Sequence, residues 1–421
     1  MAKSGARSPH PDPLPEGEGE DQRGDAATAA WLMTAAGVRA RAHQILALAE
    51  AGDAPHFTYH PERLAPTVDY VLATIRANYP DLAIPFHSRW RHFSVGGVDR
   101  WALLQRQIAD ETREEIARIS FELAVTSVLL DAGAGAAWRY REAGGGAYAR
   151  SEGLGVASFH LFRSGLFAND AGNPLRAEAA ALRSLDGDRL AVGMQVAPDN
   201  PLVGIEGRVL LLRRLGDALA AQPELFGADG RIGGLFDHLR AQAMDGKLPA
   251  SAILAALLRG FGAIWPGRHS LGGVNLGDVW QHRVGLVPFH KLSQWLAYSL
   301  IEPLAAAGVA VTEIDGLTGL AEYRNGGLFL DLGVIVPRDP GLISRVLTVD
   351  AEPVVEWRAL TVALLDRVAD GVRKSLQMDA RRLPLARVLE GGTWAAGRRI
   401  AGEKRPGGPP PLTIASDGTV F

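Results

Sequence analysis

The chain has 421 residues, and 47% of them are hydrophobic, which excludes a wholly disordered protein. Its 44 basic and 47 acidic side chains give a formal net charge of −3, which argues against nucleic-acid binding. It has no cysteine, which excludes disulfides, thiol nucleophiles and cysteine-based zinc or iron–sulfur sites. No apolar run reaches the ~20 residues of a membrane span and the N-terminus lacks the apolar region of a signal peptide, so we expect a cytoplasmic protein without a membrane partner.

Residues 1–25 are mainly proline, glycine and charged residues, with almost nothing apolar. A segment of this composition has too little apolar surface to fold, so we predict a disordered tail. The folded part is expected to begin near Thr28 and to form one large helical domain over residues 28–421. A subdivision of this domain near residues 150–265 stays open.

Apolar residues recur at helical spacing through most of the chain. They predict helices over 28–51, 68–79, from about 100, 111–130, 154–166, 177–185, 206–221, 250–260, 291–307 and 354–376. Strand-like runs cover 309–314 and 328–336, a loop or hairpin is expected around 144–146, and 84–101 and 264–290 are loop-rich. Because alternating βαβ units are absent from this pattern, the sequence predicts a mostly α, multi-helix globular fold with a few short strands.

The common phosphate, hydrolase and calcium motifs are absent from the sequence. No GxxxxGK[ST], HExxH, GxSxG or EF-hand pattern occurs, and no GxGxxG follows a strand. The eleven histidines form no tight cluster, and His87 and His92 lie five residues apart, a spacing that gives poor co-facing on a helix. Hydrogen bonding within a polar, aromatic-walled loop is favoured over a metal pair, and we expect neither a metal nor a redox cofactor.

The segment HSRWRHF is the first that combines polar groups with aromatic rings, and it holds His87, Arg89, Trp90, Arg91 and His92. An arginine beside tryptophan and histidine suits a planar ligand or a phosphate, through stacking and forked donors. These five residues are therefore candidate substrate-binding residues. The alternative is a structural loop held by bonds from arginine to carbonyl oxygens.

Asp131 ends a nearly all-apolar helical segment. A lone carboxylate there must be paired, protonated or facing a cavity, which makes it a candidate catalytic residue. The alternative is a helix C-terminal aspartate that bonds nearby backbone amides.

Glu322, Tyr323, Arg324 and Asn325 lie between two glycine-rich points. A carboxylate beside tyrosine and arginine suits an acid, a base or a cation stabiliser. The alternative is a turn with Asn325 and the following glycine at its corner.

A fourth segment, VVEWRALTV, and two weaker ones, PFHKLSQW and EGGTWAAGRR, hold further candidates. Glu356 and Arg358 are two residues apart in a helical pattern and so point in different directions; the alternative is a surface glutamate and an arginine whose stem lies on the core. His290 and Lys291 are candidates for a phosphate contact, and Trp394 for a pocket wall. The alternative for each of these three is a structural role.

The motifs together resemble the uracil-catabolism protein family of fungi and bacteria, over residues from about 28 to 421. The segments that carry the resemblance are IPFHSRWRHF, SVLLDAGAGAAWRYREA, VPFHKLSQWLAYSLIEPL, DGLTGLAEYRNGGLFLDLGV, VVEWRALTVALLD, EGGTWAAGRRIA and the terminal SDGTVF. The resemblance implies a role in degrading uracil, by a route in which ribosylated uracil is opened and an N-ribosylurea-type intermediate appears.

A more distant resemblance is to the queuosine-salvage N-glycosidase family, which is related in fold to the helical DNA glycosylases. SVLLDAGAGAAW is similar to that family at Asp131, AEYRNGGLFLDLG at Glu322, and EWRALTV at Glu356 and Arg358. Two departures stand out: Glu322 replaces an aspartate, and small residues replace an Asn-Phe-aromatic run. The resemblance implies a DNA-glycosylase-like helical architecture and cleavage of an N-glycosyl bond.

Cleavage of an N-ribosyl bond passes through an oxocarbenium-like sugar, which a carboxylate near C1 stabilises. We expect Glu322 to be this carboxylate, Asp131 to orient water or substrate, and residues 87–92 to hold a 5′-phosphate if one is present. The expected partner is therefore a small uracil-derived riboside or ribotide. The alternatives are a non-catalytic ligand-binding or scaffold component of the same route and, less favoured, an amidohydrolase.

Overall fold

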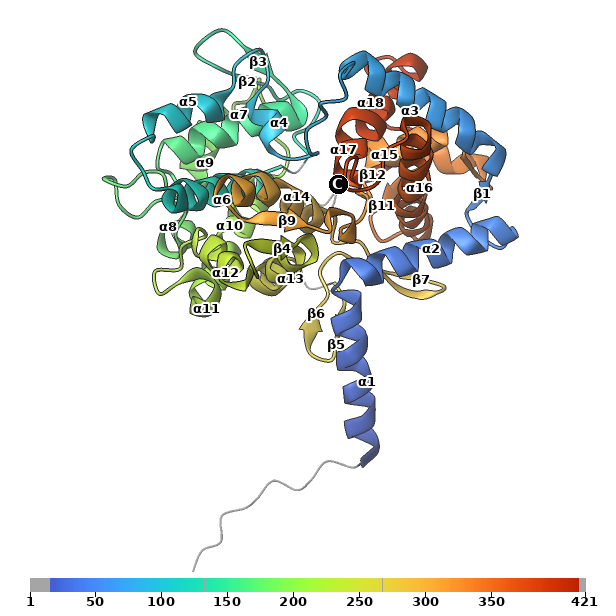
Figure 1. The fold of residues 1–421 in the computed structure, drawn as a ribbon, viewed down its shortest axis with the longest axis horizontal. Coiled ribbons are helices and arrows are strands. Elements are labelled where there is room, and N and C mark those ends of the chain that lie inside the picture. Colours follow the sequence, from blue (N-terminus) through green and yellow to red (C-terminus); the bar gives the residue numbers. More distant parts are fainter. Residues whose placement is uncertain (1–15, 132, 267, 416–421) are drawn as a thin grey trace, which may run out of the picture.

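A computed structural model describes residues 16–131, 133–266 and 268–415 of the chain. Helices dominate these ranges and the strands are short, so the predicted mostly α fold is confirmed (Figure 1). Within the same ranges, no helix combines the length and the apolar character needed to cross a membrane.

The helices differ widely in length, from a single turn to seven turns. In the first part of the chain they are α1 Glu16–Leu32, α2 Ala35–Ala51, α3 Leu64–Asn78, α4 Trp90–Phe93, α5 Arg100–Gln107, α6 Arg113–Leu129, α7 Arg150–Arg163, α8 Ala179–Arg183, α9 Gly187–Gly193, α10 Ile205–Ala220, α11 Pro223–Phe226, α12 Gly234–Gln242 and α13 Ala250–Phe261. In the second part they are α14 Lys291–Ala306, α15 Tyr323–Asp331, α16 Glu352–Leu376, α17 Leu385–Val388 and α18 Trp394–Lys404, with a π-helical turn, η5, at Leu389–Thr393.

Each described sheet consists of two short strands. The antiparallel pairs are β1 Phe57–Tyr59 with β10 Ile335–Pro337, β2 Tyr140–Arg141 with β3 Ala147–Tyr148, β5 Ser270–Leu271 with β6 Val274–Asn275, and β7 Val279–His282 with β8 Gly285–Pro288. The parallel pairs are β4 Lys247–Pro249 with β9 Ala310–Thr312 and β11 Val346–Thr348 with β12 Thr413–Ala415.

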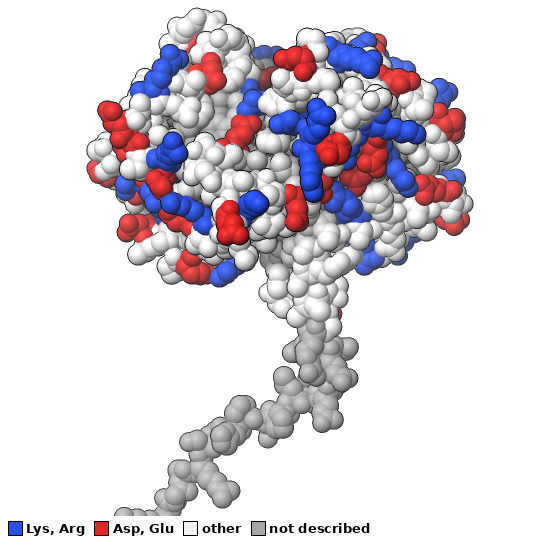
Figure 2. Space-filling model, in the orientation of Figure 1, with Lys and Arg blue, Asp and Glu red and all other residues white. Residues whose placement is uncertain are grey.

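The elements gather into two halves that lie side by side in Figure 1, with α4 to α14 in one half and α2, α3 and α15 to α18 in the other. In the first half α14 packs on α6 and α10 on α8; in the second half α16 packs on α2 and α15 on α18. One cluster of buried apolar side chains extends from Ala35 to Leu412 and so includes both halves. Basic and acidic side chains are interspersed over the face that Figure 2 shows.

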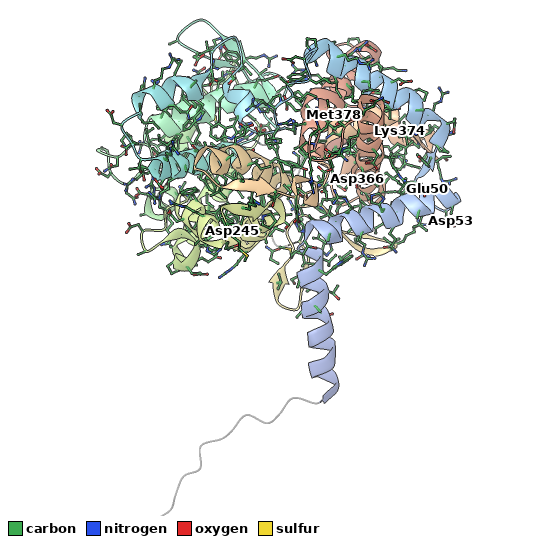
Figure 3. All side chains as sticks on the ribbon, viewed as in Figure 1. Glu50, Asp53, Asp245, Asp366, Lys374 and Met378 are labelled. Atoms are coloured by element: carbon green, nitrogen blue, oxygen red, sulfur yellow. The ribbon has the colours of Figure 1, made fainter. Side chains whose placement is uncertain are left out.

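Asp366 fastens α16 to α2, and Figure 3 labels it on α16. Its carboxylate binds Arg39 Nε and His43 Nε2 on α2, each at 2.9 Å. Burial raises the pKa of Asp366, but the bonds from His43 and Arg39 outweigh it and leave the pKa below its usual range.

One prediction near the N-terminus is wrong. The single helix expected over 28–51 is two helices, because α1 ends at Leu32 and Thr34 caps α2: its Oγ1 accepts a hydrogen bond from the Gly37 N–H at 3.0 Å. The disordered tail expected over 1–25 stays a prediction; α1 begins within it, at Glu16, and residues 1–15 fall outside the described residues.

The strand predicted over 328–336 is also wrong. Its first part belongs to α15, which Glu322 starts by accepting hydrogen bonds from two backbone N–H groups, and only β10 is extended. Gly333, in the left-handed conformation with φ at 72°, separates the two elements. The apolar alternation of LFLDLGVIV gave no sign of the cap that precedes it.

Close packing of α18 on α15 gives a test of the fold. A Cβ at Gly397 meets the carbonyl oxygen of Arg324, whereas a Cβ at Gly402 in the same helix meets nothing within 4 Å. We expect Gly397→Ala to lower the free energy of unfolding by about 1–3 kcal/mol. Gly402→Ala should leave it unchanged or raise it by up to about 1 kcal/mol, because alanine favours a helix. Urea unfolding of both variants measures the difference, and equal effects contradict this packing.

Candidate active site

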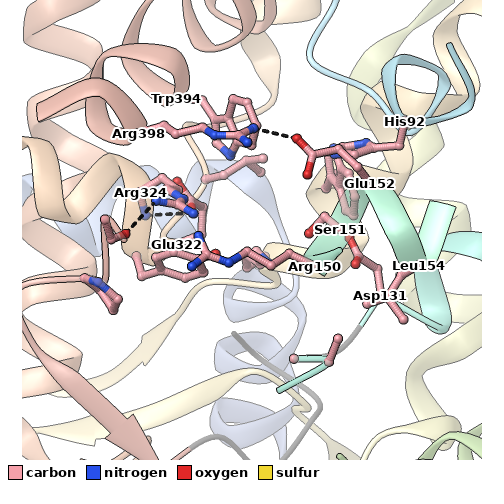
Figure 4. Close-up of a pocket in the computed structure, with 18 of the residues that line it drawn as sticks. His92, Asp131, Arg150, Ser151, Glu152, Leu154, Glu322, Arg324, Trp394 and Arg398 are labelled. Atoms are coloured by element: carbon pink, nitrogen blue, oxygen red, sulfur yellow. Dashed lines mark hydrogen bonds and ion pairs between the residues drawn. The ribbon is translucent and has the colours of Figure 1, made fainter. Parts of the chain in front are cut away.

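A cavity of about 330 Å³ lies between the two halves and collects several of the predicted site residues. From the first half it is lined by the start of α7 and the segment after α6, and from the second by the start of α15 and by α18, as Figure 4 shows. The predicted residues that line it are His87, His92, Asp131, Lys291, Glu322, Tyr323, Arg324 and Trp394.

Glu322 presents a carboxylate that the backbone holds in place. Its Oε2 accepts a hydrogen bond from the Arg324 N–H at 2.8 Å, and its Oε1 accepts one from the Asn325 N–H at 2.6 Å. Only 7% of the residue is exposed, and burial raises the pKa of its carboxyl above the usual range although these N–H groups and Lys291 oppose the shift. The result is a rigid carboxylate whose charged form is costly, at the wall of a cavity.

Lys291, the first residue of α14, is a cation on the same cavity wall whose charge acts on Glu322. Burial lowers the pKa of its ammonium group, and the charges of Glu322 and Asp131 oppose that shift. The ammonium nitrogen lies 6.0 Å from the ring centre of Trp295. Burial raises the pKa of Glu322 and lowers that of Lys291, so the two pKa values lie closer together than they do in water.

Asp131 is held by Arg89, which lies behind it. Arg89 is fully buried, and its Nη1 donates to Asp131 Oδ2 at 2.9 Å while its Nε donates to Ser127 Oγ at 2.6 Å. The ion pair keeps the Asp131 carboxylate as an acceptor facing the cavity, so it suits holding a water molecule or a sugar hydroxyl.

His87 is oriented by a second carboxylate. Its Nδ1 lies 2.7 Å from Glu390 Oε2, and Glu390 belongs to the π-helical turn before α18. The His87 ring lies near the rings of Trp295 and Trp394, with centroid distances of 6.3 and 5.8 Å. Because Glu390 takes Nδ1, the ring offers Nε2 to the cavity, the arrangement of a proton donor or acceptor.

His92 is the other histidine of the cavity. Burial, together with the charges of Arg89 and His87, holds its pKa well below the usual range. The ring is therefore neutral at physiological pH and contributes no charge to ligand binding.

Arg358 lies outside the cavity but connects two of its charged residues. Its Nη1 and Nη2 bind the two carboxylate oxygens of Asp278 at 2.8 Å each, and its Nε donates to the Ala321 carbonyl at 3.3 Å. Asp278 Oδ2 also accepts from the Lys291 N–H at 3.0 Å. Burial raises the pKa of Asp278, but the interactions with Arg358 outweigh it and lower the pKa to about 2. The pair thus fixes the residue before Glu322 and the start of α14.

Three further predicted residues lie away from the cavity. Trp90 and Arg91 line a different cavity, where Arg91 Nη2 pairs with Glu302 at 2.7 Å. His290 is buried, and its Nε2 is 2.8 Å from the Leu32 carbonyl. The polar groups of Arg91 and His290 are thus engaged in structural contacts.

Two others also have structural partners. Glu356 Oε1 accepts hydrogen bonds from the backbone N–H groups of His56 and Phe57, at 3.0 and 2.9 Å. Asn325 is fully buried beside Glu322, and its Nδ2 donates to the Leu320 carbonyl at 3.2 Å. Neither side chain lines the cavity.

The structure adds residues that sequence reasoning missed. Arg150 and Glu152 from the start of α7, Arg398 from α18 and Trp295 from α14 line the cavity. Arg398 pairs with Glu152 across it (Figure 4). The arginines occur in the glycine-rich segments GGGAYARSEG and GGTWAAGRR, and that was the only signal.

Within residues 16–131, 133–266 and 268–415, no group of three His, Cys, Asp or Glu side chains is arranged to hold a metal ion.

Comparison with known proteins places the chain among fungal relatives. Residues 31–421 match the family described as "Protein of unknown function (DUF1688)". The chain is 39% identical over 404 residues to Protein urg3 of Schizosaccharomyces pombe, covering 94% of this chain and 99% of that protein. It is 38% identical over 436 residues to Uracil catabolism protein 4 of Lachancea kluyveri, covering 93% and 98%. The resemblance to the uracil-catabolism proteins is confirmed; that to the queuosine-salvage family stays a prediction.

The Arg358–Asp278 pair gives a prediction for the stability of the site. Asp278→Asn leaves the buried guanidinium without its countercharge, which typically costs about 3–5 kcal/mol of unfolding free energy. The matched control is Asp217→Asn, because Asp217 pairs with Arg183 at an exposed position; we expect a change below about 1 kcal/mol there. Urea unfolding measures both. If Asp278→Asn lowers the unfolding free energy no more than the control does, the Arg358–Asp278 pair does not hold the site in place.

Proposed function

We propose a function for this chain from the premise that it belongs to the DUF1688 family, as its match over residues 31–421 shows. One relative of nearly the same length is named Uracil catabolism protein 4, and we assign this chain a role in uracil catabolism. Within that role, we infer that the chain hydrolyses the N-ribosyl bond of a ribosylurea-type substrate. Water adds to C1 of the ribose, the bond from C1 to nitrogen breaks, and a proton passes to the leaving nitrogen, giving ribose and urea.

The observation that carries the proposal is the Glu322 carboxylate at the cavity wall. It is 7% exposed and held by two backbone N–H groups. As the C1–nitrogen bond breaks, positive charge develops on the sugar, and a fixed carboxylate in a desolvated site stabilises that charge without reorganisation. The costly ionised form of Glu322 is thereby favoured in the transition state more than in the free protein.

The other polar groups of the cavity supply the remaining steps. Asp131, held by Arg89, accepts a hydrogen bond from the attacking water or from a ribose hydroxyl. His87, oriented by Glu390, donates through Nε2 to the leaving nitrogen or to the urea carbonyl. The Trp295 and Trp394 rings next to His87 reduce the access of water to this part of the cavity.

The direct test is turnover of N-ribosylurea and its 5′-phosphate by the purified chain, with urea release followed by mass spectrometry. We expect Glu322→Gln to lower the rate by about 100-fold or more, the usual effect of removing one electrostatic stabiliser. Glutamine also places an amide NH2 against one of the two backbone donors, which costs about 1 kcal/mol of stability. Thermal unfolding of the variant confirms that it is still folded at the assay temperature.

The control for this test is Glu206→Gln, which makes the same chemical change at an exposed position of α10. It should retain the full rate. Unchanged turnover in Glu322→Gln contradicts the assignment of the carboxylate. Saturable stabilisation by the compounds without any urea release favours a non-catalytic binding protein.

The raised pKa of Glu322 predicts the pH dependence of the rate. The stabilising form is the ionised one, so kcat/KM falls as the pH drops through the pKa of Glu322, which burial holds above the ordinary value of about 4.3. The Lys291 charge favours the ionised form, and Lys291→Met should therefore move this acid limb to higher pH. The pH–rate profiles of the two proteins measure the shift, and an acid limb that stays in place excludes Glu322 as the titrating group.

A further inference from the structure

Arg324 lies on the cavity wall with no carboxylate partner among the described residues. Only 5% of the residue is exposed, and its Nη1 donates to the Gly408 carbonyl at 3.3 Å. A buried guanidinium is costly unless an opposite charge compensates it. The position therefore favours an anionic group supplied by the ligand of the cavity.

Arg150 brings a second guanidinium to the same place. It begins α7, in the other half of the molecule, and its Nη2 donates to the Gly407 carbonyl at 3.3 Å. Gly407 and Gly408 are consecutive and both left-handed, with φ at 75° and 61°, so one turn of the chain receives both arginines. Figure 4 shows the two side chains in the same part of the cavity. Neither bonds a carboxylate within the described ranges, so both retain their charge for a ligand.

The other arginines that lie nearby in or behind the cavity wall are already compensated. Arg89 pairs with Asp131, and Arg398 pairs with Glu152. In the segment 87–92, which the sequence suggested as the phosphate clamp, Arg91 pairs with Glu302 in another cavity, and His92 is neutral. An anionic ligand group is therefore better served by Arg150 and Arg324 than by that segment.

We propose that Arg150 and Arg324 form a subsite for a phosphate monoester, so that the substrate is a 5′-phosphorylated riboside rather than a free riboside. The inference rests on the proposed function and names its substrate class. Two guanidinium forks match the oxygens of a phosphate dianion, which a neutral hydroxymethyl group cannot replace. Glu322 and Arg324 line the same cavity, so one ligand can place its sugar at the carboxylate and its phosphate at the guanidinium.

The test uses calorimetric titration of the full chain with ribose 5-phosphate and with ribose, at constant ionic strength. We expect ribose 5-phosphate to bind at least about 10-fold more tightly, the contribution of one charge-assisted hydrogen bond or more. Arg324→Gln and Arg150→Gln should each lower its affinity about 10-fold and leave the affinity for ribose unchanged. Arg324→Lys keeps the charge but loses the fork, so it should lose part of the affinity.

The matched control is Arg259→Gln, which removes an exposed arginine of α13 that pairs with Glu224. It should bind ribose 5-phosphate as the unaltered protein does. Since Arg150 is exposed, Arg150→Gln keeps the test valid if Arg324→Gln fails to fold. Three outcomes would overturn the subsite. They are equal affinities for ribose 5-phosphate and ribose, no binding of ribose 5-phosphate, and an equal loss of affinity for ribose 5-phosphate in Arg150→Gln and Arg259→Gln.

The outcomes separate this inference from the proposed function. If the arginine variants leave binding unchanged but Glu322→Gln abolishes urea release from unphosphorylated N-ribosylurea, the subsite is wrong and the hydrolase stands. If ribose 5-phosphate binding depends on both arginines while Glu322→Gln retains turnover, the subsite stands and the assignment of the carboxylate falls.

Discussion

The buried ion pair between Arg358 and Asp278 is the contact on which the arrangement of the site depends. It joins the residue before Glu322 to the first turn of α14, where Lys291 begins the helix. The two elements are far apart in the sequence, and each presents its charge to the same cavity. Because Arg358 is buried and only 12% of the Asp278 side chain is exposed, any movement that separates them leaves an uncompensated charge in the protein interior. The pair thereby positions Glu322 relative to Lys291, although neither Arg358 nor Asp278 lines the cavity.

Burial also sets the chemistry of the groups that this pair positions. It raises the pKa of Glu322 and lowers that of Lys291, so each group is held in a state where its charge is costly. A ligand that develops positive charge relieves the first cost, and one that carries negative charge relieves the second. Interactions of this kind are stronger in a cavity than in water, because the surroundings screen them less. Burial thus makes the charges of Glu322 and Lys291 costly in the empty cavity, and it strengthens the binding of a ligand that carries the opposite charge.

The sequence predicted the long helices and the mostly α class well, since apolar periodicity is a local property. It also singled out Asp131, Glu322 and His87, which line one cavity, because polar residues in apolar surroundings demand an explanation. It could not separate them from Glu356, whose carboxylate accepts N–H groups from a strand about 300 residues earlier. The strand expected over 328–336 failed for a related reason: Glu322 caps a helix, and the apolar pattern does not encode a cap. Arg150 was missed because an arginine in a glycine-rich loop looks like any solvated residue.

The partners of the arginines divide them into two groups. Arg358 and Arg89 face carboxylates, and their charge is spent on fixing Asp278 and Asp131 in place. Within the described residues Arg150 and Arg324 donate to carbonyl oxygens, and Arg324 also lies 5.0 Å from the ring centre of Tyr323; these contacts orient a guanidinium without neutralising it. An arginine with a purely structural role is stabilised most by a carboxylate. Carbonyl partners leave the charge of the guanidinium uncompensated, which suits a site where the ligand supplies the negative charge. The fold thus fixes its acids with one set of arginines and keeps the other set open to the cavity.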